Sequence, residues 1–256
     1  DLRGEPSGMS ASVAGAEGAE ATRPVARPIS RVQRRLRRVA GGVVGGLVSL
    51  GIVLVALLAP LLAPQNPIEG DITTRLVPPA WDTRGSASRP LGTDELGRDT
   101  LSRLIYGSRI SLLASVLAVL IAASLGVSLG LVGGFYGRWV DLVVTTLINI
   151  MMTFPFVLLA LAVIAVLGPS FPNMVFVMGI TGWPLYARVV RAQVLKLKVR
   201  EFIVASEALG LPALGIMLGR VLPNLVNSIV VLTTLEVARM IILESFLSFL
   251  GLGVQP

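Results

Sequence analysis

The sequence has neither cysteine nor histidine among its 256 residues. The lack of cysteine excludes a disulfide framework. The two absences together exclude a Cys/His zinc site and a serine or cysteine nucleophile activated by histidine. Charged residues are scarce, at 14%, whereas hydrophobic residues make up 54%, far more than the core of a soluble domain requires. The composition therefore predicts a polytopic membrane protein, excludes most enzyme classes and gives no reason to expect a metal or cofactor site.

A phosphate-binding glycine loop is also missing. No G-x-x-x-x-G-K-[ST] motif occurs, and the only lysines, Lys196 and Lys198, follow no glycine-rich turn. The net charge of +7 would suit a nucleic-acid partner, but in membrane proteins Arg and Lys mark the cytoplasmic ends of helices. We therefore expect no nucleic-acid binding and no nucleotide bound by this chain.

The hydrophobic pattern divides the chain into four parts. Residues 1–30 are predicted to be a disordered tail, 31–62 a basic anchor with the first transmembrane helix, 63–109 an extracytoplasmic segment, and 110–256 the core of an all-α bundle. The stretches long enough to cross a bilayer, at about 20 residues each, are 39–62, 110–132, 139–167, 171–190 and 222–243.

Arginines indicate the orientation of these five spans. Residues 31–38 contain five arginines directly before the first span, which predicts a cytoplasmic N-terminus. Counting spans from there places 63–107 outside, 188–220 in the cytoplasm and the residues from 244 onward outside. The inner loop carries six basic and two acidic side chains, which agrees with that count: Arg188, Arg191, Lys196, Lys198, Arg200 and Arg220 against Glu201 and Glu207.

Several features inside the spans have structural or functional interpretations. The second span repeats a small residue at every fourth position from Ala114 to Gly134, which predicts close helix packing within the bundle or, alternatively, against a partner subunit. Pro155 predicts a kink, for packing rather than gating. Glu236 and Arg239, three residues apart, are expected to pair on one helical face, and Glu244 is expected where water can reach it.

The cytoplasmic loop has an unusual pattern. "KVREFIVASEALG" is rich in helix formers, and Gly210 followed by Leu-Pro should end that helix. A second short helix should follow, with Leu214, Met217 and Leu218 on one face, before Pro223 opens the next span. Such a pair of helices suits a cytoplasmic partner, but it also suits an amphipathic segment lying on lipid headgroups.

This loop resembles the coupling loop of binding-protein-dependent ABC importer permeases, often written as EAA, three residues, Gly, nine residues, then Ile, one residue and Leu-Pro. Gly210 takes the glycine position and Leu222-Pro223 falls at the expected distance. The chain departs from the pattern at the triplet, which reads Val204-Ala205-Ser206, and at the isoleucine, which is Arg220.

Three more stretches resemble the dipeptide, oligopeptide and nickel permeases of the second-permease type. They are "LGTDELGRDTLSRLIYGSRISL" from Leu91, "GWPLYARVVRAQVLKLKVREF" from Gly182, and "LESFLSFLGLGVQP" from Leu243, which in these permeases dips toward the pathway. The resemblance implies a type I importer permease with five spans here and a sixth expected beyond Pro256.

The resemblance also implies a function and partners. The chain would be the membrane-spanning permease of an ATP-driven peptide importer in the bacterial inner membrane. Its implied partners are a second homologous permease, two ATPase subunits or a fused pair, an extracytoplasmic substrate-binding protein, the peptide and membrane lipid. ATP and Mg would be bound by the ATPase subunits, so the chain itself would not be an enzyme.

The implied coupling residues are Glu201, Phe202, Ala205, Ser206, Glu207, Leu209, Gly210, Leu214, Met217, Leu222 and Pro223. The candidates for the pathway or its gate are Glu236, Arg239, Glu244, Phe246 and Phe249.

Other functions remain open at this stage. The same family includes importers of nickel and other small solutes, although a chain without His or Cys offers nickel few ligands. An ion-driven secondary transporter would need paired broken helices and mid-membrane acidic ligands, of which only Glu236 is a candidate. An intramembrane protease lacks histidine, and Asp141 has no second aspartate in a neighbouring span. A purely structural scaffold would not need the charged loop.

Overall fold

The computed structural model describes residues 31–251, and the side chains from residue 42 onward. The predicted tail at 1–30 and the end of the predicted dipping loop at 252–256 lie outside these residues. The chain divides into two units, residues 1–48 and 49–256. The described part is helical, and its only β-type pairing is an isolated bridge between Thr93 and Asp99. The predicted all-α class is confirmed for this part of the chain.

The first unit contains the beginning of helix α1 (Arg31–Leu57). The helix starts in the arginine-rich stretch, whose side chains are not described, and continues through the apolar residues of the first predicted span. Its described apolar part, Gly42–Leu57, is shorter than a full span. In the second unit the chain continues from the end of α1 into a single turn, α2 (Ala59–Leu62).

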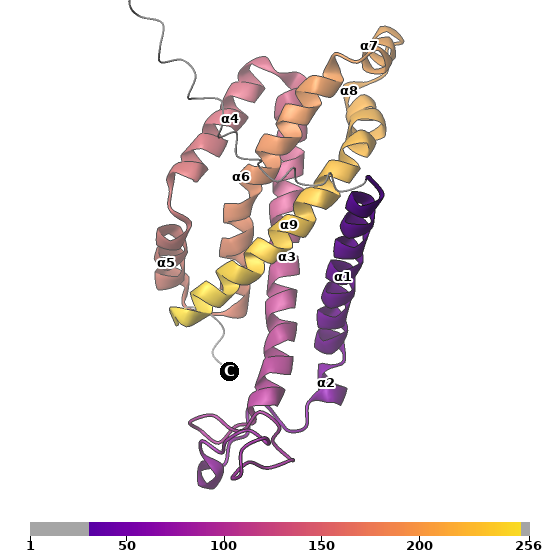
Figure 1. Cartoon of the computed structure of the whole chain (residues 1–256). Helices are drawn as coiled ribbons and strands as arrows, with labels where there is room; N and C mark the ends of the chain where they lie inside the picture. The colour runs from indigo at the N-terminus through magenta and orange to yellow at the C-terminus, as the bar shows by residue number, and fades with distance from the viewer. Residues whose placement is uncertain (1–30, 252–256) are drawn as a thin grey trace, which may run out of the picture. The chain divides into compact units, whose positions relative to one another are not determined.

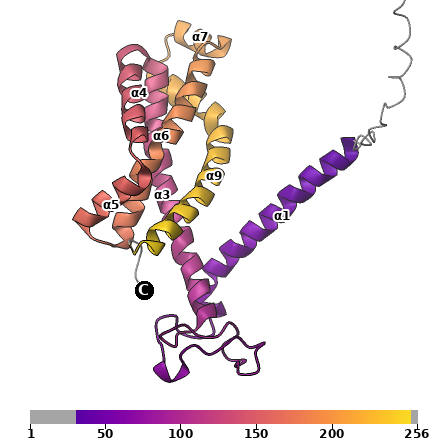
Figure 2. The same cartoon turned by 60° about the vertical axis from the view of Figure 1, so that its left-hand side comes forward.

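The second unit is a bundle around one long helix, α3 (Thr100–Tyr136). Helices α6 (Phe171–Lys198) and α9 (Leu222–Phe249) pack along it, and α4 (Arg138–Thr153) and α5 (Phe156–Leu167) lie beside α6 (Figure 1). The short helices α7 (Glu201–Ala208) and α8 (Ala213–Ile216) lie at the end of the bundle opposite to residues 63–99 (Figures 1 and 2). This arrangement agrees with the prediction that the two segments face opposite sides of a membrane.

The stripe of small residues on α3 accounts for its close contact with α6. All six positions of the stripe are buried. A Cβ atom added to Gly126 would lie 2.4 Å from the carbonyl oxygen of Trp183, and one added to Gly130 would lie 2.6 Å from that of Ala187. The stripe therefore packs inside this chain, as the first of the two sequence interpretations predicted.

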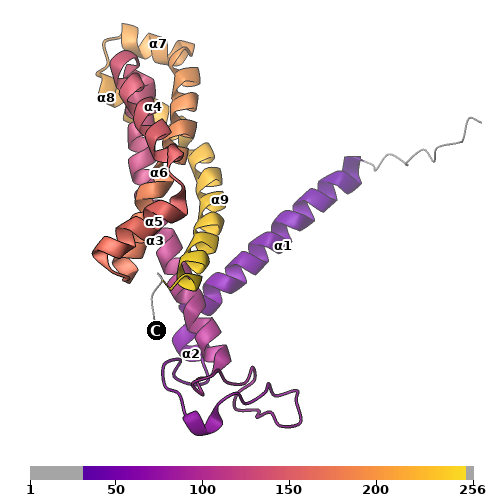
Figure 3. The same cartoon turned by 90° about the vertical axis from the view of Figure 1, so that its left-hand side faces the viewer.

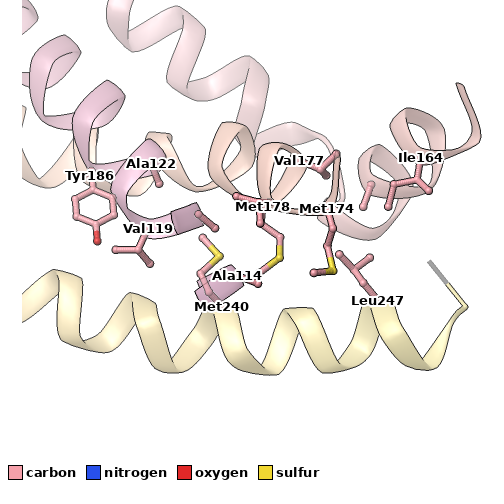
Figure 4. Close-up of a cluster of buried hydrophobic side chains, with 13 residues drawn as sticks. Ala114, Val119, Ala122, Ile164, Met174, Val177, Met178, Tyr186, Met240 and Leu247 are labelled. Carbon is pink, nitrogen blue, oxygen red and sulfur yellow. The ribbon is translucent and has the colours of Figure 1, made fainter. Parts of the chain in front are cut away.

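The main core lies between α3, α6 and α9. Met174 and Met178 of α6 converge there with Met240 and Leu247 of α9 (Figure 4), and all four side chains are fully buried. Methionine fills irregular gaps because its side chain is unbranched and flexible. Burial of this cluster fixes α9 along α3.

Among the described residues, two helices are long and apolar enough to cross a membrane: α3 and the continuous helix Ala213–Phe249. The pair α4 and α5 would make a third span if it counts as one, and the two are bent by 85° at the break between them (Figure 3). Phe154 and Pro155 have extended backbone there, because the residue before a proline avoids helical conformation. The predicted kink is confirmed, and it is a complete break of the helix.

The other expected spans differ in detail from the helices found. Helix α6 is 28 residues long but is less apolar than α3 and Ala213–Phe249, so its crossing stays a prediction. Residues 100–109, assigned to the extracytoplasmic segment, form the first turns of α3. The gap of residues 133–138 between the second and third predicted spans shrinks to Gly137, whose φ of 67° joins α3 directly to α4. An apolar run in the sequence predicts the residues that can lie inside the membrane, whereas the helix that contains them can extend beyond the membrane.

Residues 63–99 form an ordered, mostly non-helical segment with one short 3₁₀ turn, η1 (Ile72–Thr74). The carboxylate of Asp94 holds this segment together by accepting hydrogen bonds from the backbone N–H groups of Leu96 and Arg98. It also forms ion pairs with the side chains of Arg98 and Arg103. Burial alone would raise the pKa of Asp94, but the hydrogen bonds from Arg98 and Leu96 outweigh it and lower the pKa to about 2. Asp99 then caps α3 by accepting from the N–H of Ser102 at 2.8 Å.

Candidate functional site

The predicted pair of short helices in the loop is present. Helix α6 ends at Lys198, α7 follows from Glu201, and α8 begins at Ala213 after Pro212. Gly210 has a φ of 76°, a conformation that glycine adopts far more readily than other residues. This glycine lets the chain reverse between α7 and α8.

The second short helix is not a separate piece. It continues through a π-helical turn, η2 (Met217–Val221), directly into α9. The N–H of Leu222 donates to the carbonyl of Met217, five residues earlier. Pro223, which has no N–H, therefore sits in the first turn of α9, after a widened turn. Pro223 lies at the start of α9 as expected, but no break precedes it: α8, η2 and α9 form one continuous helical rod, Ala213–Phe249.

The inner face of the loop is packed onto the bundle. Ile203, Ile216 and Val221 are fully buried in a cluster with Leu131 and Phe135 of α3. The ammonium group of Lys198 donates to the carbonyl of Phe135 at 2.6 Å and lies 5.6 Å from the centre of its ring. These contacts fix the loop against the end of α3.

The outer face of the loop exposes large apolar side chains. We call this face the loop surface and define it by Phe202, Val204, Leu209, Leu211, Leu214 and Leu218, all exposed. Leu209 is 81% exposed and Leu214 61%. Glu201, Ala205, Glu207 and Gly210 are exposed among them. A cluster of apolar side chains with polar neighbours is typical of an interaction site.

Three of the predicted coupling residues lie elsewhere. Met217, expected on the same face as Leu214 and Leu218, is buried with Ile216, because the π turn begins there. Ser206 is buried, and its hydroxyl donates to the carbonyl of Phe202 at 2.7 Å. Leu222 is half-buried, whereas Pro223 is exposed. The pattern could not separate these faces, because both sides of the segment are apolar.

The predicted pairing of Glu236 with Arg239 is confirmed. Arg239 donates through Nη1 to both carboxylate oxygens of Glu236, at 2.9 and 3.2 Å. Glu236 is buried, whereas Arg239 is partly exposed and lines a cavity of ≈ 280 Å³. The break between α4 and α5 forms one wall of this cavity through Phe154 and Phe156.

Two further pathway candidates, Phe246 and Phe249, are exposed on α9, at 42% and 87%. Glu244 is not, which corrects the expectation of ready access to water: only 6% of it is exposed. Its carboxylate accepts a hydrogen bond from Ser111 of α3 at 2.7 Å and one from Ser248 at 2.9 Å. The residue lies at the contact between α3 and α9, so the packing of α3 buries it.

An ion pair between α4 and α6 was not predicted from the sequence. Arg191 of α6 forms a two-point pair with Asp141 of α4, with Nη2 to Oδ2 at 2.7 Å. The pair fixes α4 beside α6 near the end of the bundle that carries the loop. The two residues are 50 positions apart, so no local pattern links them.

Comparison with known proteins gives two family matches. Residues 126–256 match the model of the binding-protein-dependent transport system inner membrane component. Residues 27–79 match the N-terminal TM domain of oligopeptide transport permease C.

Curated relatives point the same way. The di/tripeptide transport system permease protein DppC of Pseudomonas aeruginosa is 43% identical over 181 residues, 71% of this chain and 60% of the relative. The dipeptide transport system permease protein DppC of Haemophilus influenzae is 38% identical over 191 residues, 75% and 65% respectively. The glutathione transport system permease protein GsiD of Pectobacterium atrosepticum is 36% identical over 171 residues, 67% and 57%.

In each case the matched part of the chain spans less than two thirds of the length of the relative. The family match nevertheless covers half of the chain, including α4 to α9 and the loop with its glycine. The chain belongs to the family of binding-protein-dependent transport system inner membrane components.

Proposed function

We propose that this chain is the membrane-spanning permease of an ATP-driven importer and forms half of the pathway for short peptides. The relatives named as dipeptide and di/tripeptide permeases support the substrate class. Nickel is a weaker candidate, since the chain has no His or Cys to ligate it. The N-terminus would lie in the cytoplasm and the bundle in the bacterial inner membrane.

The observation that carries the proposal is the loop surface. Leu214 and Leu218 of this surface lie on the continuous helix Ala213–Phe249, which runs on into α9. The other members of the surface lie on α7 and in the turn at Gly210, and α7 contacts α8 at the start of that helix. A movement of this surface would therefore be transmitted along α9 to Glu236 and Arg239. Because the chain has no phosphate-binding loop, the ATP and its Mg would be held by two ATPase subunits, or a fused pair, that dock there.

The proposed cycle follows from this rigid connection. Closure of the ATPase pair on ATP would move the docked loops and rock this chain against a second, homologous permease. A substrate-binding protein would deliver peptide at the opposite end of the bundle, near residues 63–99. An ion-driven transporter is the rival, but it offers no role for an exposed apolar surface on this loop.

Co-purification tests the docking. The full-length protein is tagged in its native membrane and extracted in mild detergent, as wild type, Leu209→Asp and Leu96→Asp. Leu209 is 81% exposed on the loop surface, and Leu96 is 56% exposed at the opposite end, so neither change disturbs a core. We expect Leu209→Asp to lose the ATPase subunits and the stimulated ATP hydrolysis while keeping the second permease.

The control variant Leu96→Asp should retain the ATPase at wild-type stoichiometry. A wild-type protein that purifies without any ATPase would contradict the proposal. Retention of the ATPase by Leu209→Asp would exclude the loop surface as its docking site.

A further inference from the structure

Glu244 is a buried carboxylate that forms no ion pair within the described residues. Its hydrogen-bond donors there are two neutral hydroxyl groups, those of Ser111 and Ser248. A buried carboxylate normally has a cation beside it, because removing the charge from water is costly. The structural role of tying α3 to α9 would be served equally well by an uncharged glutamine.

Glu244 also faces open space. It lines a cavity of ≈ 320 Å³ together with Ser248, Ser111, Ile110, Gly107, Tyr106 and Arg103, closed on one side by Pro67 and Ile68. A Cβ atom added to Gly107 would meet nothing within 4 Å. The volume is at the lower end of the range for small-molecule sites, so the cavity suits a small ligand.

The cavity has charges of opposite sign along its length. The guanidinium of Arg103 donates a hydrogen bond through Nη1 to Asp94 and makes no other hydrogen bond within the described residues. Arg103 and Ser111, which donates to Glu244, are eight positions apart on α3, a distance of about 12 Å along a helix. An extended chain of two or three residues spans about 7 to 11 Å, and the two long side chains can close the remaining distance.

The cavity adjoins the start of residues 63–99. Tyr106, Pro67 and Ile68 also line a neighbouring cavity of ≈ 480 Å³, with Pro60, Gln65 and Asn66 on its other walls. The two cavities therefore share a wall and lie side by side from the start of the non-helical segment to Glu244. Under the proposed function this is the end of the bundle that meets the binding protein.

We propose that this cavity binds a small zwitterion, with its ammonium group at Glu244 and its anionic group toward Arg103, and that the ligand is a short peptide entering the pathway. The inference rests on the proposed function. A phosphatidylethanolamine headgroup has the same pair of charges, but a peptide fits better because its free termini are two to three residues apart, close to the separation of Glu244 and Arg103.

Carboxyl labelling tests the site directly. The transporter assembled from full-length subunits is placed in nanodiscs of phosphatidylglycerol and phosphatidylcholine. Dicyclohexylcarbodiimide modifies carboxyl groups in apolar sites, and mass spectrometry measures the modified fraction of Glu244. We expect millimolar Ala-Ala to lower this fraction several-fold. N-acetyl-Ala-Ala and Ala-Ala amide, which each lack one terminal charge, should leave it unchanged.

Two lipid compositions separate the two sources of a zwitterion. If phosphatidylethanolamine in the nanodisc protects Glu244 and Ala-Ala does not, the assignment to peptide is overturned. If neither protects Glu244, the cavity is not a zwitterion site and the whole inference falls.

Uptake of Ala-Ala into proteoliposomes, with the binding protein and ATP present, tests the role in transport. Glu244→Gln keeps hydrogen bonds to both serines and loses only the charge. We expect uptake to fall about tenfold or more, because the ligand loses one hydrogen bond to a charged group. Association with the ATPase should be unchanged. Glu95→Gln, which removes an exposed carboxylate from the same end of the bundle but lies outside the cavity, should transport nearly normally.

Uptake also distinguishes the two proposals. Wild-type transport with equal transport by Glu244→Gln would overturn this inference and leave the proposed function standing. Absence of peptide uptake by the wild type would instead contradict the proposed function.

Discussion

At the scale of single residues, the fold depends on where side chains are absent. Gly126 of α3 touches the backbone of α6, whereas Gly107, on the same helix, faces open space. The sequence shows both as glycines in one apolar helix. Only the position of the neighbouring helix tells which one is required for packing.

The pair gives a matched prediction. Gly126→Ala would place a Cβ atom 2.4 Å from both the Trp183 carbonyl oxygen and the Tyr186 Cβ, so α3 and α6 must separate. We expect a loss of about 1–3 kcal/mol, as for other overpacked cores, and a lower melting temperature by circular dichroism in detergent. Gly107→Ala should stabilise the helix by about 0.5–1 kcal/mol. Equal melting temperatures for the two variants would contradict the packing described for the stripe.

At the scale of secondary structure, the positions of helix breaks were predicted from the sequence better than the positions of helix ends. Pro155 and Gly210 both lie at the breaks that their chemistry indicates, since one lacks an N–H group and the other adopts positive φ. The ends of α3 and α6 were not predictable, because hydrophobicity reports the membrane and not the helix. The π turn that joins α8 to α9 was also not predictable, because its residues have no pattern that distinguishes a π turn from an α-helix.

Gly210 provides the prediction at this scale. A β-branched residue at its φ of 76° is strained by about 1–2 kcal/mol, so Gly210→Val should loosen α7 without touching the bundle. Amide hydrogen exchange should then rise in residues 201–208 and stay unchanged in α3. Gly215→Ala is the control, because its nearest contact would be an ordinary 3.5 Å. Unchanged exchange in α7 of the valine variant would show that the glycine is not needed for the turn.

At the scale of the whole molecule, the sequence predicted the helical class, the loop with its two short helices, and the pairing of Glu236 with Arg239. It did not predict contacts between distant segments, such as Arg191 with Asp141, or the burial of Glu244 against Ser111, 133 residues away. Such contacts depend on which helices become neighbours. For the same reason, the coupling residues could be located as a segment but not sorted into Met217, which is buried, and Leu209, which is exposed.

The central claim is that the loop surface docks an ATPase on the cytoplasmic side. The absence of cysteine allows single-cysteine variants with no background in this chain. Leu209→Cys and Leu96→Cys would each be treated in native membrane vesicles with a short bifunctional maleimide cross-linker. The account predicts that Leu209→Cys links to an ATPase subunit and that Leu96→Cys does not. An ATPase cross-link at Leu96, or none at Leu209 while the complex is intact, would contradict it.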